Sequence, residues 1–211
     1  MGLWSSTLTA GLLQIQPPGD TVVAGLGALT ILVLIALSAF FSSSEIAMFS
    51  LPQHRIDSLV EDGVPGSETV KALKTDPHRL LITILVGNNI VNIAMSSIST
   101  GLLVYLGLGQ GQAVTIATFG ITALVLLFGE SAPKSYAVEN TESWALRIAR
   151  PLKLSEYVLL PLVILFDYLT RVVNKITGGR SAIESSYVTR DEIQDIIETG
   201  EREGVIDEEE R

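Results

Sequence analysis

The chain has 211 residues, of which 47% are hydrophobic and 18% are charged, and its mean hydropathy is positive. Its formal net charge of −9 is concentrated near the end of the chain, because residues 184–211 hold eleven acidic and three basic residues. This composition is typical of a membrane protein, and the absence of cysteine excludes disulfides and thiolate metal sites.

Two long stretches without Asp, Glu, Lys or Arg predict the membrane-spanning helices, at residues 21–44 and 80–129. A spanning helix needs roughly 20 apolar residues, so the first stretch can hold one span and the second can hold two. Three closely spaced glycines interrupt the second stretch and favour a turn. We therefore predict spans at residues 21–49, 80–105 and 112–130, with a loop at residues 106–111.

The basic residues predict the orientation of these spans. Residues 1–20 and the 106–111 loop contain no Lys or Arg, because all fourteen lie between the first two spans or after the third. Cytoplasmic segments of membrane proteins are enriched in Lys and Arg. We therefore expect a multi-pass protein of the cell membrane with an extracellular N-terminus, residues 1–20, and a cytoplasmic C-terminus.

The segments outside the spans are also expected to be helical, which makes the predicted fold an all-α membrane protein. Residues 50–79 predict a cytoplasmic helix pair, opened by Pro52, broken at residues 62–66 and capped again by Ser67. The apolar patch at residues 157–166 is too short to cross the membrane, so residues 131–180 are expected to form juxtamembrane or re-entrant helices. Residues 181–211 predict an acidic helical linker that belongs to a cytoplasmic bundle.

Polar side chains on the three predicted spans fall at a similar depth, in the cytoplasmic half of the membrane. Ser38 and Ser42 are four residues apart on one face of the first span, Asn88 and Asn89 lie in the second, and Glu130 ends the third. Each lies about 17 to 21 residues from the outer end of its span, or roughly 25–30 Å. Oxygen ligands without His or Cys suit a hard cation: Mg²⁺ in a small octahedral site, and Ca²⁺ or Na⁺ otherwise.

The backbone beside Glu130 can contribute a further oxygen. Gly129 leaves its carbonyl accessible, and Pro133 has no N–H with which to donate the usual helical hydrogen bond to that carbonyl. A site with a single carboxylate suits an ion that must be released again.

Structural explanations compete with this interpretation. The serines at positions 38 and 42–44 could each donate to the preceding turn of their own helix, and Glu130 could be a boundary residue paired with Lys134. The small residues at 96–101 favour close helix packing. Adjacent amides at Asn88 and Asn89, with Asn92 one turn further, need partners in a lipid environment and mark a pathway or a contact between helices.

Four segments together resemble the CNNM/CorC family, whose membrane part is called the DUF21 domain: FFSSSEIAMFSL, DPHRLLITILVGNNIVNIAMSSIST, GESAPKS and TRDEIQDIIETGEREGVIDEEER. The resemblance covers residues 30–211. It implies a Mg²⁺ transporter, proposed to work as a Na⁺-driven exporter, that forms a homodimer with three spans and a juxtamembrane belt in each subunit.

The resemblance also implies the site residues and the regulation. The Mg²⁺ site would be lined by Ser38, Ser42, Asn88, Asn89, Gly129 and Glu130. In the family the acidic bundle leads to a CBS-domain pair that binds ATP with Mg²⁺; that pair would follow Arg211, so ATP is expected to act only through domains missing from this chain.

Two functions from different classes remain open at this point. One is transport of Mg²⁺ through a dehydrated site within the lipid bilayer, and the other is a membrane Mg²⁺ sensor or scaffold that regulates a partner channel. We expect no nucleic-acid partner. We also expect no enzyme activity, because no nucleophile with a paired base lies at the depth of the polar residues.

Overall fold

The computed structural model describes residues 18–177, and within that range the chain forms helices and no strands. In chain order the elements are α1 (Pro18–Ser50), α2 (Gln53–Glu61), α3 (Ser67–Lys74), α4 (Pro77–Tyr105), α5 (Gln110–Leu124), the π-helix η1 (Val125–Ser131), α6 (Ala132–Glu139) and α7 (Thr141–Thr177). The predicted acidic linker at residues 181–211 lies outside the described residues, as does most of the predicted N-terminal segment.

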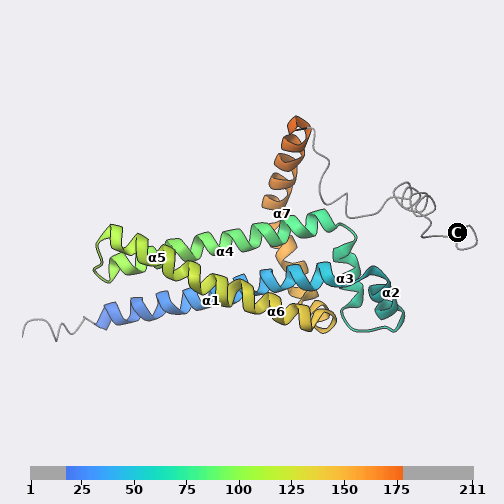
Figure 1. Ribbon diagram of the computed structural model, residues 1–211, viewed down its shortest axis with the longest axis horizontal. Helices are drawn as coiled ribbons and strands as arrows, with labels where there is room; N and C mark the ends of the chain where they lie inside the picture. Colours follow the sequence, from blue (N-terminus) through green and yellow to red (C-terminus); the bar gives the residue numbers. More distant parts are fainter. Residues whose placement is uncertain (1–17, 178–211) are drawn as a thin grey trace, which may run out of the picture.

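Three long helices run side by side and form the body of the molecule (Figure 1). They are long and apolar enough to cross a membrane, and they cover Thr21–Ser50, Pro77–Tyr105 and Gln110–Glu139. The predicted three membrane-spanning helices are therefore confirmed. The chain is a multi-pass membrane protein.

The third helix continues nine residues beyond Glu130, where the sequence predicted its end. α5, η1 and α6 follow one another without a break, and Pro133 lies in the first turn of α6. Because Pro133 cannot donate to the carbonyl of residue 129, the chain widens to a π-helix just before it; Ala132 N donates to Leu127 O, five residues earlier. The proline therefore changes the hydrogen-bond register of the helix and does not end it.

The first half of α1 is apolar and almost unburied. Val22, Leu26, Leu29 and Leu32 are between 57% and 63% exposed, whereas burial begins at Ser38. So many exposed large apolar side chains on one helix require lipid or another protein around them. The buried core correspondingly lies toward the other end of the bundle, near α2 and α3.

The packing of α1 on α4 is set by a glycine. A Cβ built on Gly87 would lie 2.4 Å from the ring of Phe41, so only glycine lets α4 approach this ring. Phe41 belongs to the buried core, which also includes Met48, Ile56, Ile84, Met95 and Leu152. This contact fixes the register in which Ser38 of α1 meets Asn88 of α4.

The expected helix pair at residues 50–79 corresponds to α2 and α3. Pro52 lies at the N-cap of α2, and the turn between the helices contains Gly63 and Gly66, with φ of 67° and 96°. Ser67 does not cap α3 as predicted. The cap position belongs to Gly66, and the Ser67 hydroxyl instead donates back to the Val64 carbonyl at 2.7 Å.

α7 is a single helix of 37 residues that runs across the bundle rather than along it (Figure 1). It packs on α1, α3 and α4 and contains Pro151 and Pro161. Within residues 18–177, α7 is not among the helices that are long and apolar enough to span a membrane. The segment expected to hold several juxtamembrane helices thus consists of α6 and one long crossing helix.

Candidate functional site

Ser38 is the centre of a buried polar cluster between α1 and α4. Its side chain is fully buried, and its hydroxyl lies 3.1 Å from Asn88 Oδ1 and 3.1 Å from Asn92 Oδ1. A hydroxyl has one proton, so it donates to one of the two amides at a time. The two amide oxygens therefore compete for one hydroxyl proton, so at any time one of them has no donor from Ser38.

The four buried serines of α1 divide into two pairs. Ser43 and Ser44 donate to carbonyls of the preceding turn, at 2.7 Å and 2.6 Å, as the structural explanation predicted. Ser38 instead reaches across to α4. Ser42 is 2% exposed, and its hydroxyl has no hydrogen-bond partner among the described residues. A buried hydroxyl without a partner costs about 1–3 kcal/mol. A cation bound to the Ser42 hydroxyl oxygen would remove that cost.

Gly129 brings the third helix against Ser38. A Cβ built on Gly129 would lie 2.9 Å from Ser38 Oγ and 3.2 Å from Ser38 Cβ, so any side chain at this position would displace α1. Gly129 lies within η1, the π-helix that precedes Pro133. π-helical turns of this kind occur frequently at functional sites, because they change which backbone and side-chain groups point inward.

Glu130 follows Gly129 and is half-buried. The possible pairing of Glu130 with Lys134 is not present, because Lys134 Nζ lies 3.1 Å from Glu45 Oε2. Among residues 18–177 the Glu130 carboxylate has neither an ion-pair nor a hydrogen-bond partner. Glu130 and Asn92 line the same cavity, of about 260 Å³, between α4 and α5. An unpaired carboxylate beside a cluster of neutral oxygens favours the binding of a positive ion.

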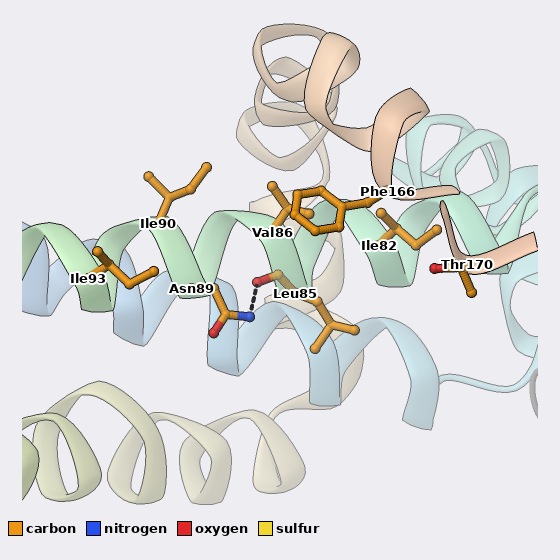
Figure 2. Close-up of a pocket in the computed structure, with 8 residues that line it drawn as sticks. All are labelled: Ile82, Leu85, Val86, Asn89, Ile90, Ile93, Phe166 and Thr170. Atoms are coloured by element: carbon orange, nitrogen blue, oxygen red, sulfur yellow. Dashed lines mark hydrogen bonds between the residues drawn. The ribbon is translucent and has the colours of Figure 1, made fainter. Parts of the chain in front are cut away.

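Asn89 is not brought to the cluster. It is exposed, its Nδ2 donates to Leu85 O at 2.9 Å, and it lines a separate apolar cavity of about 420 Å³ with residues of α4 and α7. Figure 2 shows Asn89 on α4 with its bond to Leu85; Phe166 and Thr170 of α7 complete the lining of this cavity. The structure thus gathers Ser38, Asn88 and Gly129, with Glu130 nearby, and leaves Asn89 on another face.

Asn92 is not in the set of ligands predicted from the sequence, yet its amide oxygen lies beside Ser38. Adjacent residues on a helix are about 100° apart, so Asn88 and Asn89 cannot share a face, whereas Asn88 and Asn92 are one turn apart and can. The same four-residue spacing places Ser38 and Ser42 on one face of α1. On α4 this spacing pairs Asn88 with Asn92 and not with Asn89.

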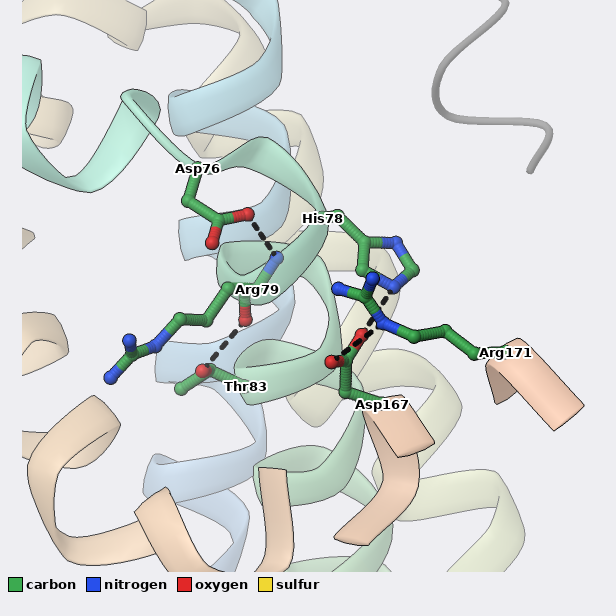
Figure 3. Close-up of polar contacts among 6 residues, drawn as sticks. All are labelled: Asp76, His78, Arg79, Thr83, Asp167 and Arg171. Carbon is green, nitrogen blue, oxygen red and sulfur yellow. Dashed lines mark hydrogen bonds and ion pairs between the residues drawn. The ribbon is translucent and has the colours of Figure 1, made fainter. Parts of the chain in front are cut away.

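Polar contacts join α7 to the start of α4 (Figure 3). His78 Nε2 lies 3.0 Å from Asp167 Oδ1, and Arg171 Nε donates to Asp167 Oδ2 at 3.0 Å. Arg79 Nε lies 2.7 Å from Glu156 Oε1 and forms an ion pair with it. The Arg79 Nε–H does not point at this oxygen closely enough to make a hydrogen bond. The contacts of His78 and Arg79 attach α7 to α4, whereas the bond from Arg171 to Asp167 lies within α7.

Glu156 is the most buried charged residue among these contacts. It is 5% exposed, and Lys153 Nζ donates to its other carboxylate oxygen at 2.7 Å. A second contact joins α2 to the first turn of α7, where Arg55 donates to Glu142 at 2.7 Å. The hydrogen bond from Arg55 lowers the pKa of the Glu142 carboxyl. The ion pairs of Glu156 and the Arg55–Glu142 pair all lie at the α2–α3 end of the molecule.

The chemistry of the cluster is that of neutral oxygens with one carboxylate. Residues 18–177 contain no group of three or more His, Cys, Asp or Glu side chains that could hold a metal ion. A cation at the cluster would therefore meet hydroxyl, amide and carbonyl oxygens and the single charge of Glu130. Such ligands suit a hard cation, bound with modest affinity.

Comparison with known proteins gives consistent matches. Residues 29–210 match the family described as "Cyclin M transmembrane N-terminal domain". The chain is 35% identical over 184 residues to a DUF21 domain-containing protein of Arabidopsis thaliana, described as chloroplastic, covering 87% of this chain and 27% of the relative. It is 32% identical to the inner membrane protein YfjD of Escherichia coli K12, covering 76% and 37% of the two chains.

A further relative has a transport function in its name. The polyamine export protein of Escherichia coli K12 is 28% identical over 189 residues, covering 84% of this chain and 42% of the relative. The chain thus spans between about a quarter and a half of the length of these relatives. The match therefore covers only a part of these longer relatives.

Proposed function

Because the chain belongs to the family of the cyclin M (CNNM) transmembrane N-terminal domain, we propose that it transports Mg²⁺ across the membrane. The observation that supports this most directly is the buried cluster of Ser38, Asn88 and Asn92 beside Gly129, with the unpaired carboxylate of Glu130 next to it. Mg²⁺ prefers oxygen ligands in a small site, and close contact between α1 and η1 makes this site small.

The ligands of the transported ion would come from all three spanning helices. We assign the hydroxyls of Ser38 and Ser42, the amide oxygens of Asn88 and Asn92, the Gly129 carbonyl and the Glu130 carboxylate. These groups replace the water around the ion, so Mg²⁺ is dehydrated at this point. Because Glu130 supplies the only full charge, the ion is held weakly enough to leave.

Export driven by Na⁺ entry is the direction and driving force that we propose, on the basis of the family resemblance. Na⁺ is also bound by carbonyl and hydroxyl oxygens within membrane proteins. Its entry down a concentration gradient can supply the free energy for moving Mg²⁺ outward.

The proposed orientation places the N-terminus of α1 and the α4–α5 loop outside, and α2 and α3 in the cytoplasm. α7 would then lie along the cytoplasmic face of the membrane, as a belt around the spans, and two chains would form a homodimer. Cysteine labelling tests the orientation, since the chain has no cysteine of its own. A cysteine at Gly109 should react with an impermeant reagent from outside, and one at Asp62 only from the cytoplasm; the reverse pattern would refute it.

Export of polyamines is a second candidate, favoured by the Escherichia coli relative that carries this activity in its name. A linear polyamine is a chain of ammonium groups, and Glu130 with the neighbouring amides and hydroxyls could accept it as well. The small size of the Ser38 cluster favours a single ion over an extended molecule.

Flux measurements on liposomes that contain only this protein would test the proposal. We expect Mg²⁺ efflux that accelerates when Na⁺ is added on the opposite side, and little inhibition by spermidine. Uptake of labelled spermidine with no Mg²⁺ flux would favour the polyamine candidate. Mg²⁺ binding without flux of either solute would favour a sensor or scaffold.

A further inference from the structure

A groove between α4 and α5, lined by both apolar and polar side chains, continues from the Ser38 cluster toward the α4–α5 loop. The cavity has a volume of about 260 Å³, and its polar lining consists of Asn92 and Ser96 on α4, Thr118 and Thr122 on α5, and Glu130 on η1. Asn92 belongs to both the cluster and the groove, since its amide oxygen faces Ser38. The groove is therefore continuous with the candidate ion site.

The threonines of this groove differ from the other threonines of the spanning helices. Thr30, Thr83, Thr100 and Thr115 each donate to the carbonyl four residues earlier, at 2.8–2.9 Å. This is the usual way in which a hydroxyl is satisfied within a membrane helix. It leaves these four hydroxyls with a partner in their own helix.

The hydroxyls in the groove make no such bond. Among the described residues, no hydrogen bond involves the side chains of Ser96, Thr118 or Thr122. A hydroxyl at membrane depth without a protein partner is unfavourable in lipid, and it becomes favourable when water or an ion meets it. Thr118 and Thr122 are exposed and Ser96 is half-buried, so all three hydroxyls are accessible to water or an ion that enters the groove.

The position of the groove gives it a direction. Thr118 lies twelve residues before Glu130 on the same helical run, which corresponds to roughly 18 Å along the axis. Beyond Thr118, toward the loop, Ala113 and Ala117 are buried, at 0% and 2% exposure, where α5 packs on α4. The groove thus begins at the unpaired Glu130 carboxylate and ends near the buried Ala113 and Ala117 of α5.

We propose that this groove is the water-filled route by which the cation passes between the Ser38 cluster and the side of the membrane that holds the α4–α5 loop. The inference rests on the proposed transport function. The hydroxyls of Ser96, Thr118 and Thr122 replace part of the hydration shell along the route, and separation of α5 from α4 at Ala113 and Ala117 completes it.

Removal of the hydroxyls tests the route while keeping the shape of the side chains. In a Thr118→Val, Thr122→Val double variant, Mg²⁺ flux should fall by about tenfold per hydroxyl, the usual effect of losing a hydrogen bond to a charged group. Equilibrium binding of Mg²⁺ should stay within about twofold of wild type, because the cluster is intact. Thr115→Val is the matched control on the same helix, and it should transport normally. Wild-type flux in the double variant would overturn the proposal.

Thiol labelling tests the hydration of the groove independently of the cargo. Thr118→Cys should react with a charged methanethiosulfonate reagent much faster than Phe119→Cys, which lies at the same depth but does not line the groove, and Mg²⁺ should slow that reaction. Equal rates at the two positions would overturn the route whether or not the wild type moves Mg²⁺. Fast labelling at residue 118 in a protein without Mg²⁺ flux would support the hydrated route and reject Mg²⁺ as its cargo.

Discussion

Gly129 and Ser38 approach so closely that a Cβ on the glycine would lie 2.9 Å from the serine hydroxyl. This contact joins the third helix to the first at the point where Ser38 also meets two amides of α4. Three helices thus converge on one hydroxyl. The absence of a side chain at residue 129 therefore determines the size of the candidate ion site.

A methyl group at this position should separate the helices. We expect Gly129→Ala to lower the free energy of unfolding by about 1–3 kcal/mol, as overpacking usually does, and to abolish measurable Mg²⁺ binding. Gly120→Ala is the matched control, because no atom lies within 4 Å of a Cβ built on Gly120. That change should leave binding intact and stabilise the helix slightly. Equal behaviour of the two variants in calorimetry and thermal unfolding would contradict the close contact.

The attachment of α7 to α4 gives a second prediction, which concerns stability. Glu156 is 5% exposed and lies 2.7 Å from both Arg79 and Lys153, whose side chains are 39% and 30% exposed, so Glu156→Gln leaves two half-buried cations without their counter-charge. Because solvent screens both cations, the cost should lie between the roughly 1 kcal/mol of an exposed pair and the about 3–5 kcal/mol of a fully buried one. We expect a clear fall in the thermal unfolding midpoint.

An exposed pair provides the control for that change. Asp57 lies 2.7 Å from Lys71 but both side chains are more than 40% exposed, so Asp57→Asn should barely change the midpoint. If Glu156→Gln were equally mild, α7 would be held chiefly by its apolar contacts with α1, α3 and α4, and the ion pair would be incidental.

The spans could be predicted from the sequence because hydrocarbon excludes charge, so that charge-free stretches of sufficient length identify them. The end of the third helix could not be located in the same way. Glu130 suggested a boundary, yet the helix continues beyond it, and Pro133 is accommodated by a π-helix that only the packed structure reveals. Local signals thus give the existence of an element more reliably than its end.

The candidate site was predicted in part for a related reason. The depth of each polar residue follows from counting along its helix, and this placed Ser38, Asn88 and Gly129 together. Which face a residue occupies depends on the rotation of its helix, which counting does not give. The sequence analysis therefore named Asn89, whereas in the structure Asn92 lies beside Ser38. The groove beyond the cluster depends on how α4 packs against α5, and hydroxyls that lack partners cannot be recognised from the sequence.

The third prediction concerns the charge of the site. Glu130→Gln keeps the shape and one oxygen of the side chain but removes its charge, so Mg²⁺ affinity should fall by at least about a hundredfold. Attraction between unit charges at about 4 Å is still roughly 4 kcal/mol at an effective dielectric of 20, and it is larger for a divalent ion. Calorimetric titration with Mg²⁺ measures the change directly.

Lys134→Gln separates this effect from a loss of pairing. Lys134 contacts Glu45 and not Glu130, so its neutralisation should leave Mg²⁺ affinity nearly unchanged. Retained affinity in Glu130→Gln, or an equal loss in Lys134→Gln, would sink the assignment of Glu130 as the charged ligand.

The last prediction distinguishes the two amides of α4 that lie three residues apart. Asn92 faces Ser38 with its Oδ1 at 3.1 Å, whereas Asn89 donates to Leu85 within its own helix and faces a separate apolar cavity. Asn92→Ala should therefore weaken Mg²⁺ binding by about tenfold or more, the scale of losing one contact to a charged group. Asn89→Ala removes the same amide from the same helix and should bind as wild type, with at most a change in the contact with α7. Titration of both variants with Mg²⁺, each checked for unchanged thermal unfolding, compares the two faces of α4. A loss of affinity confined to Asn89→Ala would show that the ion meets α4 on the face toward Phe166, and the cluster around Ser38 would then be a structural contact between helices.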